Sequence, residues 1–156
     1  MTDYALIIKQ IQAFAEVSAD CIALMANVSA LLYHTLGDVN WAGFYLVKNN
    51  ALLLGPFQGN IACIKIEKGK GVCGTAWAAD AVQVVEDVHT FAGHIACDSA
   101  SRSEIVLPLH RAGEVEVVAV LDIDSPVPAR FSSADVQGLT KVAQTIEQII
   151  EWGAEQ

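Results

Sequence analysis

The sequence lacks any run of uninterrupted apolar residues close to the roughly 18 that a membrane-spanning helix requires. Its first residues, MTDYALIIKQIQAFAEV, also lack the basic segment and the small-residue cleavage site of an export signal. We therefore expect neither membrane insertion nor export, and a cytoplasmic location. In that reducing compartment the four cysteines would form no structural disulfide framework, and any disulfide would be transient.

Basic residues are scarce and dispersed. Nine Lys and Arg stand against eighteen Asp and Glu, which leaves a net charge of −9. A chain without a basic cluster has no electrostatic footprint for phosphate backbones, so nucleic acid is excluded as a partner. The sequence also has no low-complexity tract, linker or internal repeat. With 156 residues, we expect positions 1–156 to form one folded domain.

Motifs for nucleotides and structural zinc are absent or incomplete. The segment GKGVCG at 69–74 matches the glycine pattern of dinucleotide-binding folds, but too little chain follows it for a full helix and a second parallel strand. We interpret it as a glycine turn that places Cys73. The cysteines at 63, 73 and 97, taken with His94, lack the closely spaced ligand pair of structural zinc sites.

The strand LDIDS at 121–125 carries two acids, Asp122 and Asp124. We expect their side chains to point to opposite faces, and therefore not to hold one metal ion together. Asp122 would face a ligand and Asp124 would serve the following turn, although a solvated strand end is an equally good interpretation of Asp122.

Helical patterns stand at both ends of the chain and short β-prone runs lie between them. Thr2 and Asp3 are suited to cap a first helix, and a second helix is predicted from near position 18 or 20 to near 37. The runs WAGFYLV, ALLLGPF, IACIKI, VQVVEDV, SEIVLPLH and VEVVAVLDI are predicted strands, and Ser132 and Asp135 have the spacing of a capping box at the start of a last helix.

This order of elements favours an α+β fold with a central antiparallel sheet, because the connections between most strands are too short for parallel crossovers. We expect the N- and C-terminal helices to pack on one face of the sheet. The other face, with the long connection 86–102, would be left for a ligand.

The segment FAGHIACDSASRSEIVLPL at 91–109 contains the most informative cysteine. Cys97 lies among small and polar residues, so its thiol should be accessible and open to redox chemistry, whereas Cys21 fits a buried, inert thiol in a helix. His94 is either a cation that favours a Cys97 thiolate or an ordinary surface histidine. Glu104, at the edge of an apolar strand, is placed where burial can raise a carboxyl pKa.

Five segments, in order, resemble the free methionine-(R)-sulfoxide reductases, a single-domain family with the GAF fold. They are NWAGFYL, LGPFQG, ACIKIEKGKGVCG, FAGHIACDSASRSEIVLPL and VLDIDSP, which lie between positions 40 and 126. The resemblance implies a GAF-like fold and the reduction of free methionine sulfoxide. It further implies Cys97 as nucleophile, Cys63 as resolving cysteine and Cys73 as a third thiol of undefined role.

The same resemblance implies that Trp41 walls the substrate methyl group while Glu104 and Asp122 hold the sulfoxide oxygen. Two neighbouring carboxyls can share one proton, which the departing oxygen needs. The resemblance also implies the R epimer as substrate, thioredoxin as reductant, no metal, flavin or nucleotide cofactor, and a possible homodimer through the terminal helices.

Two other functions use some of the same features. A GAF module that senses a small molecule without turning it over would need no resolving thiol, and it is usually joined to an output domain for which we expect no room in this chain. A thiol redox switch would need Cys63 and Cys97 but neither Trp41 nor the two carboxyls.

Overall fold

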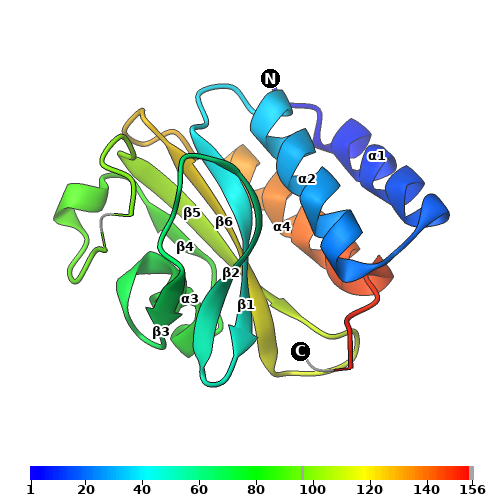
Figure 1. The fold of residues 1–156 in the computed structure, drawn as a ribbon. Coiled ribbons are helices and arrows are strands. Elements are labelled where there is room, and N and C mark those ends of the chain that lie inside the picture. Colours follow the sequence, from blue (N-terminus) through cyan, green and yellow to red (C-terminus); the bar gives the residue numbers. More distant parts are fainter. Residues whose placement is uncertain (96, 155–156) are drawn as a thin grey trace.

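Six strands form one antiparallel sheet in the order β3-β2-β1-β6-β5-β4 (Figure 1). The structure is a computed structural model that describes residues 1–95 and 97–154. The strands are β1 Trp41–Lys48, β2 Ala51–Gly59, β3 Lys65–Glu67, β4 Gln83–Val85, β5 Ser103–His110 and β6 Val117–Ser125. The helices are α1 Tyr4–Val17, α2 Cys21–Thr35, α3 Gly71–Ala79 and α4 Ser133–Ile149, with a 3₁₀ turn, η1, at Val88–Thr90.

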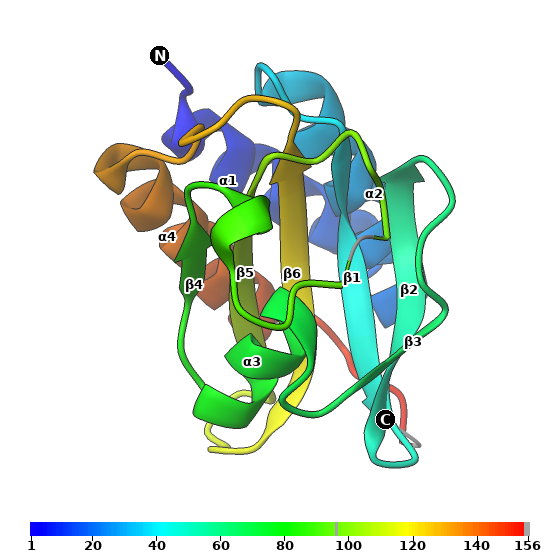
Figure 2. The same ribbon diagram turned by 90° about the vertical axis from the view of Figure 1, so that its left-hand side faces the viewer.

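The helices divide between the two faces of the sheet. Helices α1, α2 and α4 cover one face, and α3 with the long connection before β5 covers the other (Figures 1 and 2). The predicted α+β fold, with an antiparallel sheet and terminal helices on one face, is therefore confirmed. Each face has its own apolar core, built on one side around residues such as Ile11, Phe44 and Leu121 and on the other around residues such as Trp41 and Val106.

Sequence patterns located most elements but not α3. This helix is buried along most of its length, so its apolar residues follow no amphipathic period, and the pattern indicated only a short turn. The predicted strand IACIKI is a strand only over Lys65–Glu67, and positions 61–64 form a loop. The predicted strand VQVVEDV is likewise reduced to Gln83–Val85.

The glycine turn before α3 is confirmed. Gly69 and Gly71 have positive φ values of 78° and 61°, a backbone conformation that glycine adopts without steric cost. The Lys70 N–H donates to the Glu67 carbonyl (3.1 Å), and the Gly69 N–H to the Gly74 carbonyl (2.9 Å). These bonds reverse the chain after β3, so that Cys73 lies in the first turn of α3.

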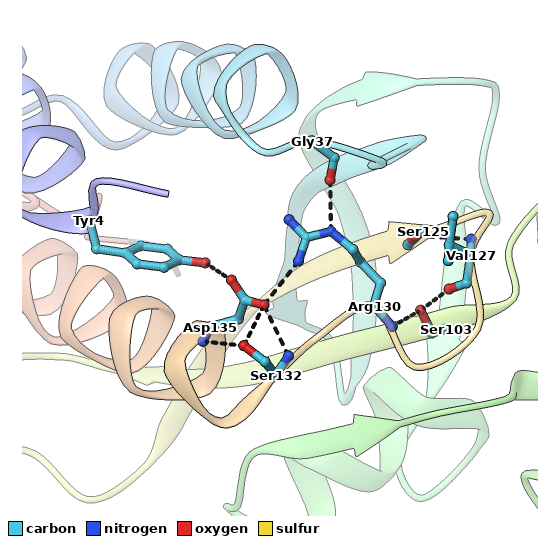
Figure 3. Close-up of polar contacts among 8 residues, drawn as sticks. All are labelled: Tyr4, Gly37, Ser103, Ser125, Val127, Arg130, Ser132 and Asp135. Atoms are coloured by element: carbon cyan, nitrogen blue, oxygen red, sulfur yellow. Dashed lines mark hydrogen bonds and ion pairs between the residues drawn. The ribbon is translucent and has the colours of Figure 1, made fainter. Parts of the chain in front are cut away.

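Asp135 joins α4 to two other parts of the chain (Figure 3). The predicted capping box with Ser132 is present, and the Tyr4 hydroxyl donates to Asp135 Oδ1 (2.6 Å). The Arg130 guanidinium donates to Asp135 Oδ2 (2.9 Å) and to the Gly37 carbonyl (2.8 Å). Beside it, the Arg130 N–H donates to the hydroxyl of Ser103, the residue before Glu104 (3.2 Å). The network therefore fixes the start of β5 relative to α1 and α4.

In the described part of the chain, no helix combines the length and the apolar character needed to cross a bilayer.

Candidate active site

A small pocket lies between the sheet and the segments that cover its α3 face. Its cavity volume is about 40 Å³. Five of the six site residues predicted from the sequence line this pocket, each from a different part of the chain. They are Trp41 from β1, Cys73 from α3, Cys97 from the 91–102 connection, Glu104 from β5 and Asp122 from β6. The prediction that this face holds the ligand site is consistent with this convergence.

Cys63, the sixth predicted residue, joins the pocket through a disulfide with Cys97. The two Cα atoms lie 5.4 Å apart although 34 positions separate them in the sequence. Cys63 belongs to the 61–64 loop after β2, and the Tyr45 hydroxyl donates to its carbonyl oxygen (2.9 Å), which fixes this loop over β1. The disulfide pairs the two cysteines that the family resemblance assigns to nucleophile and resolving thiol.

Three carboxyls and one thiol meet at the base of the pocket. Glu104 comes from β5, Asp122 and Asp124 from β6, and Cys73 from α3. The expectation that Asp122 and Asp124 point to opposite faces is wrong, because residues two apart in a strand share a face, and both side chains line this pocket. Glu104 on β5 pairs with Asp124 on β6, and Val106, two residues after Glu104, pairs with Asp122.

Burial sets the protonation of this cluster. It raises the pKa of Glu104 well above its usual range, and the negative charge of Asp122 raises it further. Burial likewise raises the pKa of Asp124 and of Asp122, but hydrogen bonds from Glu104 and from the Cys73 thiol partly offset the effect on Asp122. The cluster therefore holds protons at pH values where exposed acids have lost them.

Orphan oxygens point to the same conclusion. Among the described residues, Oδ1 of Asp122 and Oδ1 of Asp124 are buried without a hydrogen-bond donor when the carboxyls carry no protons. Shared protons supply the missing donors, since a buried acceptor without a partner costs about 1–3 kcal/mol. The donor atoms of Cys73, Glu104 and Asp122 lie within 4.8 Å of one another, so their ionised forms could also hold a divalent cation.

Cys73 is a buried thiol, 4% exposed, with no disulfide partner. Burial raises its pKa well above the usual value, and the nearby charge of Asp122 raises it further. A thiol that keeps its proton donates a hydrogen bond to Asp122 but is a poor nucleophile.

Aromatic rings form the side wall of the pocket. Trp41 is 2% exposed and its ring stacks on Phe57 and Tyr45, with centroid distances of 5.2 and 5.9 Å. Its indole N–H donates to the Asn60 carbonyl (3.2 Å), which fixes the ring orientation. Tyr45 was not predicted as a site residue, and Asp124 was wrongly assigned to the following turn. Each lies an even number of positions along a strand from a predicted site residue and therefore shares its face.

The mouth of the pocket contains His94 and Asp98. Burial lowers the pKa of His94, and the charge of His89 lowers it further, so the interpretation of His94 as a cation beside Cys97 is not supported. Asp98, also missed from the sequence, accepts hydrogen bonds from the side-chain amides of Asn40 (3.3 Å) and Asn60 (3.5 Å). Cys21 packs in the core beneath the helices, as predicted.

Comparison with known proteins agrees with this geometry. The family described as "GAF domain" matches residues 23–151. The chain is 56% identical over 129 residues to the free methionine-R-sulfoxide reductase of Escherichia coli, which covers 83% of this chain and 77% of that protein. It is 55% identical over 150 residues to Protein YtsP of Bacillus subtilis, covering 95% of this chain and 91% of that protein.

Solved structures show the same arrangement of elements. The structure of fRMsr of Staphylococcus aureus in complex with substrate has a TM-score of 0.89 and 46% identity, and the match covers 97% of both chains. A putative GAF sensor protein from Burkholderia vietnamiensis has a TM-score of 0.90 and 48% identity, covering 94% of this chain and 92% of that one. The chain is thus a GAF domain that belongs to the free methionine-R-sulfoxide reductase family.

Proposed function

We propose that this protein reduces free L-methionine (R)-sulfoxide to methionine. One observation carries the proposal: the Cys63–Cys97 disulfide lies beside a buried cluster of carboxyls that retain protons. A sulfoxide reductase needs these two features together, because the sulfur must be attacked while its oxygen is protonated. The relatives named free methionine-R-sulfoxide reductase support this choice of substrate.

In the first step the Cys97 thiolate attacks the sulfoxide sulfur. Glu104 donates a proton to the oxygen, and Asp122 shares that proton and orients the oxygen. The S–O bond breaks as the oxygen passes to Cys97, so methionine leaves and Cys97 becomes a sulfenic acid. Trp41 packs against the methyl group of the substrate, and Asp124 lies beside Glu104 and Asp122 as a second proton store.

In the second step the Cys63 thiol attacks the Cys97 sulfenic acid. The disulfide forms and the oxygen leaves as water, before further oxidation of Cys97 can occur. Cys73 takes no covalent part in these two steps, because its thiol is protonated and donates to Asp122. Its proposed role is to hold the Asp122 carboxyl in place.

The pocket described above belongs to the oxidised protein, in which the disulfide joins the 61–64 loop to Cys97. Reduction separates the 61–64 loop from the 91–102 connection and so opens the site to the next substrate. A site that closes over the whole molecule selects a free amino acid over a methionine sulfoxide within a peptide.

A dithiol protein such as thioredoxin completes the cycle by reducing the disulfide. This step requires a reducing compartment, for which we propose the cytoplasm. A homodimer through the terminal helices remains a prediction from the family resemblance.

One comparison favours a second function. The relative from Burkholderia vietnamiensis is described as a putative GAF sensor protein, and a sensor would bind its ligand without changing it. A thiol switch would form the same disulfide without forming methionine. Incubation of the reduced protein with the separate R and S epimers of free methionine sulfoxide distinguishes the three, with methionine and protein disulfide quantified together.

The reductase forms one methionine and one disulfide per protein from the R epimer only. Binding without methionine would indicate the sensor, and a disulfide without methionine would indicate the switch. The Cys97→Ser variant is the control, since a hydroxyl cannot replace the thiolate at neutral pH.

A further inference from the structure

Three exposed isoleucines flank the disulfide. Ile61 is 90% exposed, Ile64 is 75% exposed and Ile95 is 38% exposed. Ile61 and Ile95 border the pocket that Cys97 lines, and Ile64 directly follows Cys63. We name these three side chains the isoleucine rim. Single exposed apolar side chains are common on protein surfaces, but several of them gathered at one place usually mark an interaction surface.

The disulfide identifies the chemistry of the partner. It can be opened only by a thiolate that reaches one of its sulfur atoms. Cys97 lines the pocket, whereas Cys63 is half-buried in a loop whose Ile61 and Ile64 side chains are exposed, so Cys63 is reached across these side chains. A thiolate that approaches Cys63 from outside arrives within the isoleucine rim, and a protein that carries it would cover these side chains.

Charge beside the isoleucine rim is opposite to that of the whole protein. Lys65 directly follows Ile64, and Lys70 precedes Gly71, against which the Ile95 side chain lies, within a chain of net charge −9. Both lysines are exposed, whereas Lys68 lies over the Trp77 ring beside Val115, in a different pocket. Such a patch attracts an acidic partner and orients it, whereas the rest of the surface repels it.

We propose that the isoleucine rim is the docking surface of an acidic protein dithiol that reduces the Cys63–Cys97 disulfide. The inference rests on the proposed function, which requires this disulfide to be recycled. One partner thiolate attacks Sγ of Cys63 and forms a mixed disulfide, and the electrons of the broken S–S bond leave with Cys97, which takes up a proton. The second partner thiolate then attacks the partner sulfur, so that Cys63 leaves as a thiol and the partner as a disulfide.

The test measures how fast the oxidised protein gains two thiols when no sulfoxide is present, so its result is independent of the substrate. An acidic thioredoxin, kept reduced by its reductase and NADPH, is compared with dithiothreitol. Ile64→Asp, which lies outside the pocket, should lower the second-order rate constant for thioredoxin about tenfold and leave that for dithiothreitol unchanged. Val17→Asp is the matched control, because Val17 is also a strongly exposed apolar side chain but ends α1, on the other side of the sheet.

Charge reversal tests the second component of the docking surface. Lys65→Glu should slow reduction by thioredoxin several-fold at low salt and weaken the salt dependence of the rate. The exposed Lys141→Glu on α4 should change neither. A thioredoxin that retains only its attacking cysteine should be trapped on Cys63, as mass mapping would show.

The proposal is overturned if Ile64→Asp slows neither reductant, or if it slows dithiothreitol as much as thioredoxin, because the change would then act on the disulfide itself and not on docking. Trapping on Cys97, or thioredoxin no faster than dithiothreitol at equal concentration, would also overturn it. Each of these results is independent of whether the protein forms methionine.

Discussion

Glu104 is the residue whose surroundings bear most directly on the proposed chemistry. It is 7% exposed and lies beside two other acids, Asp122 and Asp124. In water this side chain would lose its proton far below neutral pH, but here burial and the charge of Asp122 raise its pKa well above that range. The site therefore retains a proton donor at pH values where an exposed glutamate has lost its proton.

Replacing either acid by its amide should slow the reduction step. Glu104→Gln and Asp122→Asn keep the shape of the side chain but cannot deliver a proton, so methionine formation should fall by roughly a hundredfold or more. The wild-type rate should also fall as pH rises through the raised pKa of the cluster. Rapid-quench measurement of methionine across pH checks both expectations, and a rate unchanged in both variants would remove the carboxyls from the mechanism.

The burial of Glu104 also lowers the stability of the folded protein at high pH. Because the pKa of Glu104 is higher in the folded than in the unfolded protein, the folded state binds more protons, and stability falls as pH rises through that interval. Glu104→Gln removes this penalty and should stabilise the protein at pH 8 by on the order of 1–3 kcal/mol, with a smaller gain near pH 5.

Urea unfolding of Glu104→Gln at the two pH values checks this expectation. The exposed Glu16→Gln on α1 is the control and should change the free energy of unfolding little at either pH. A Glu104→Gln variant less stable than wild type at pH 8 would contradict a raised pKa of Glu104 in the folded protein.

At the scale of elements, the corner where α1, α4 and the 126–131 segment meet depends on Asp135 (Figure 3). Burial alone would raise the pKa of this carboxyl, but hydrogen bonds from Tyr4 and Ser132 and the charge of Arg130 lower it overall. A lowered pKa stabilises the fold at neutral pH, and that stabilisation disappears as pH falls below about 4.

Asp135→Asn should therefore destabilise the protein by about 1–2 kcal/mol at pH 7, since it loses the ion pair and part of the cap. The loss should shrink toward pH 3. Thermal unfolding across pH measures it, with Asp38→Asn as control, because Asp38 is exposed and its φ of 56° suits Asn equally well. Equal losses at pH 7 and pH 3 would show that charge is not the cause.

Sequence patterns predict elements where one face meets solvent and fail where an element is buried on all sides. The first, second and last helices were predicted because Asp3, Asp20 and Ser132 cap them and their apolar residues recur on one face. Helix α3 is buried along most of its length, so its apolar residues do not recur on one face and the sequence shows no helical period there. Strands β3 and β4 are three residues long, so loop residues beside them were assigned to strands.

At the scale of the whole molecule, the site is made by contacts that sequence spacing cannot reveal. Trp41 pairs with Asp124 only because β1 lies beside β6, and Cys63 reaches Cys97 across 34 positions. The residues themselves were identified through motifs that resemble a known family. Tyr45 was not predicted and Asp124 was assigned to a turn, although strand periodicity was sufficient to place them beside Trp41 and Asp122.

The central claim is that Cys97 attacks the sulfoxide and Cys63 resolves the product, and single-turnover reaction of the Cys63→Ser variant tests it most directly. Reduced protein is mixed with free methionine (R)-sulfoxide, and methionine and the oxidation state of each cysteine are measured by mass spectrometry. The account predicts a burst of about one methionine per site with a sulfenic acid on Cys97, and no methionine from Cys97→Ser. Absence of a burst from Cys63→Ser, together with methionine formed by Cys97→Ser, would contradict it.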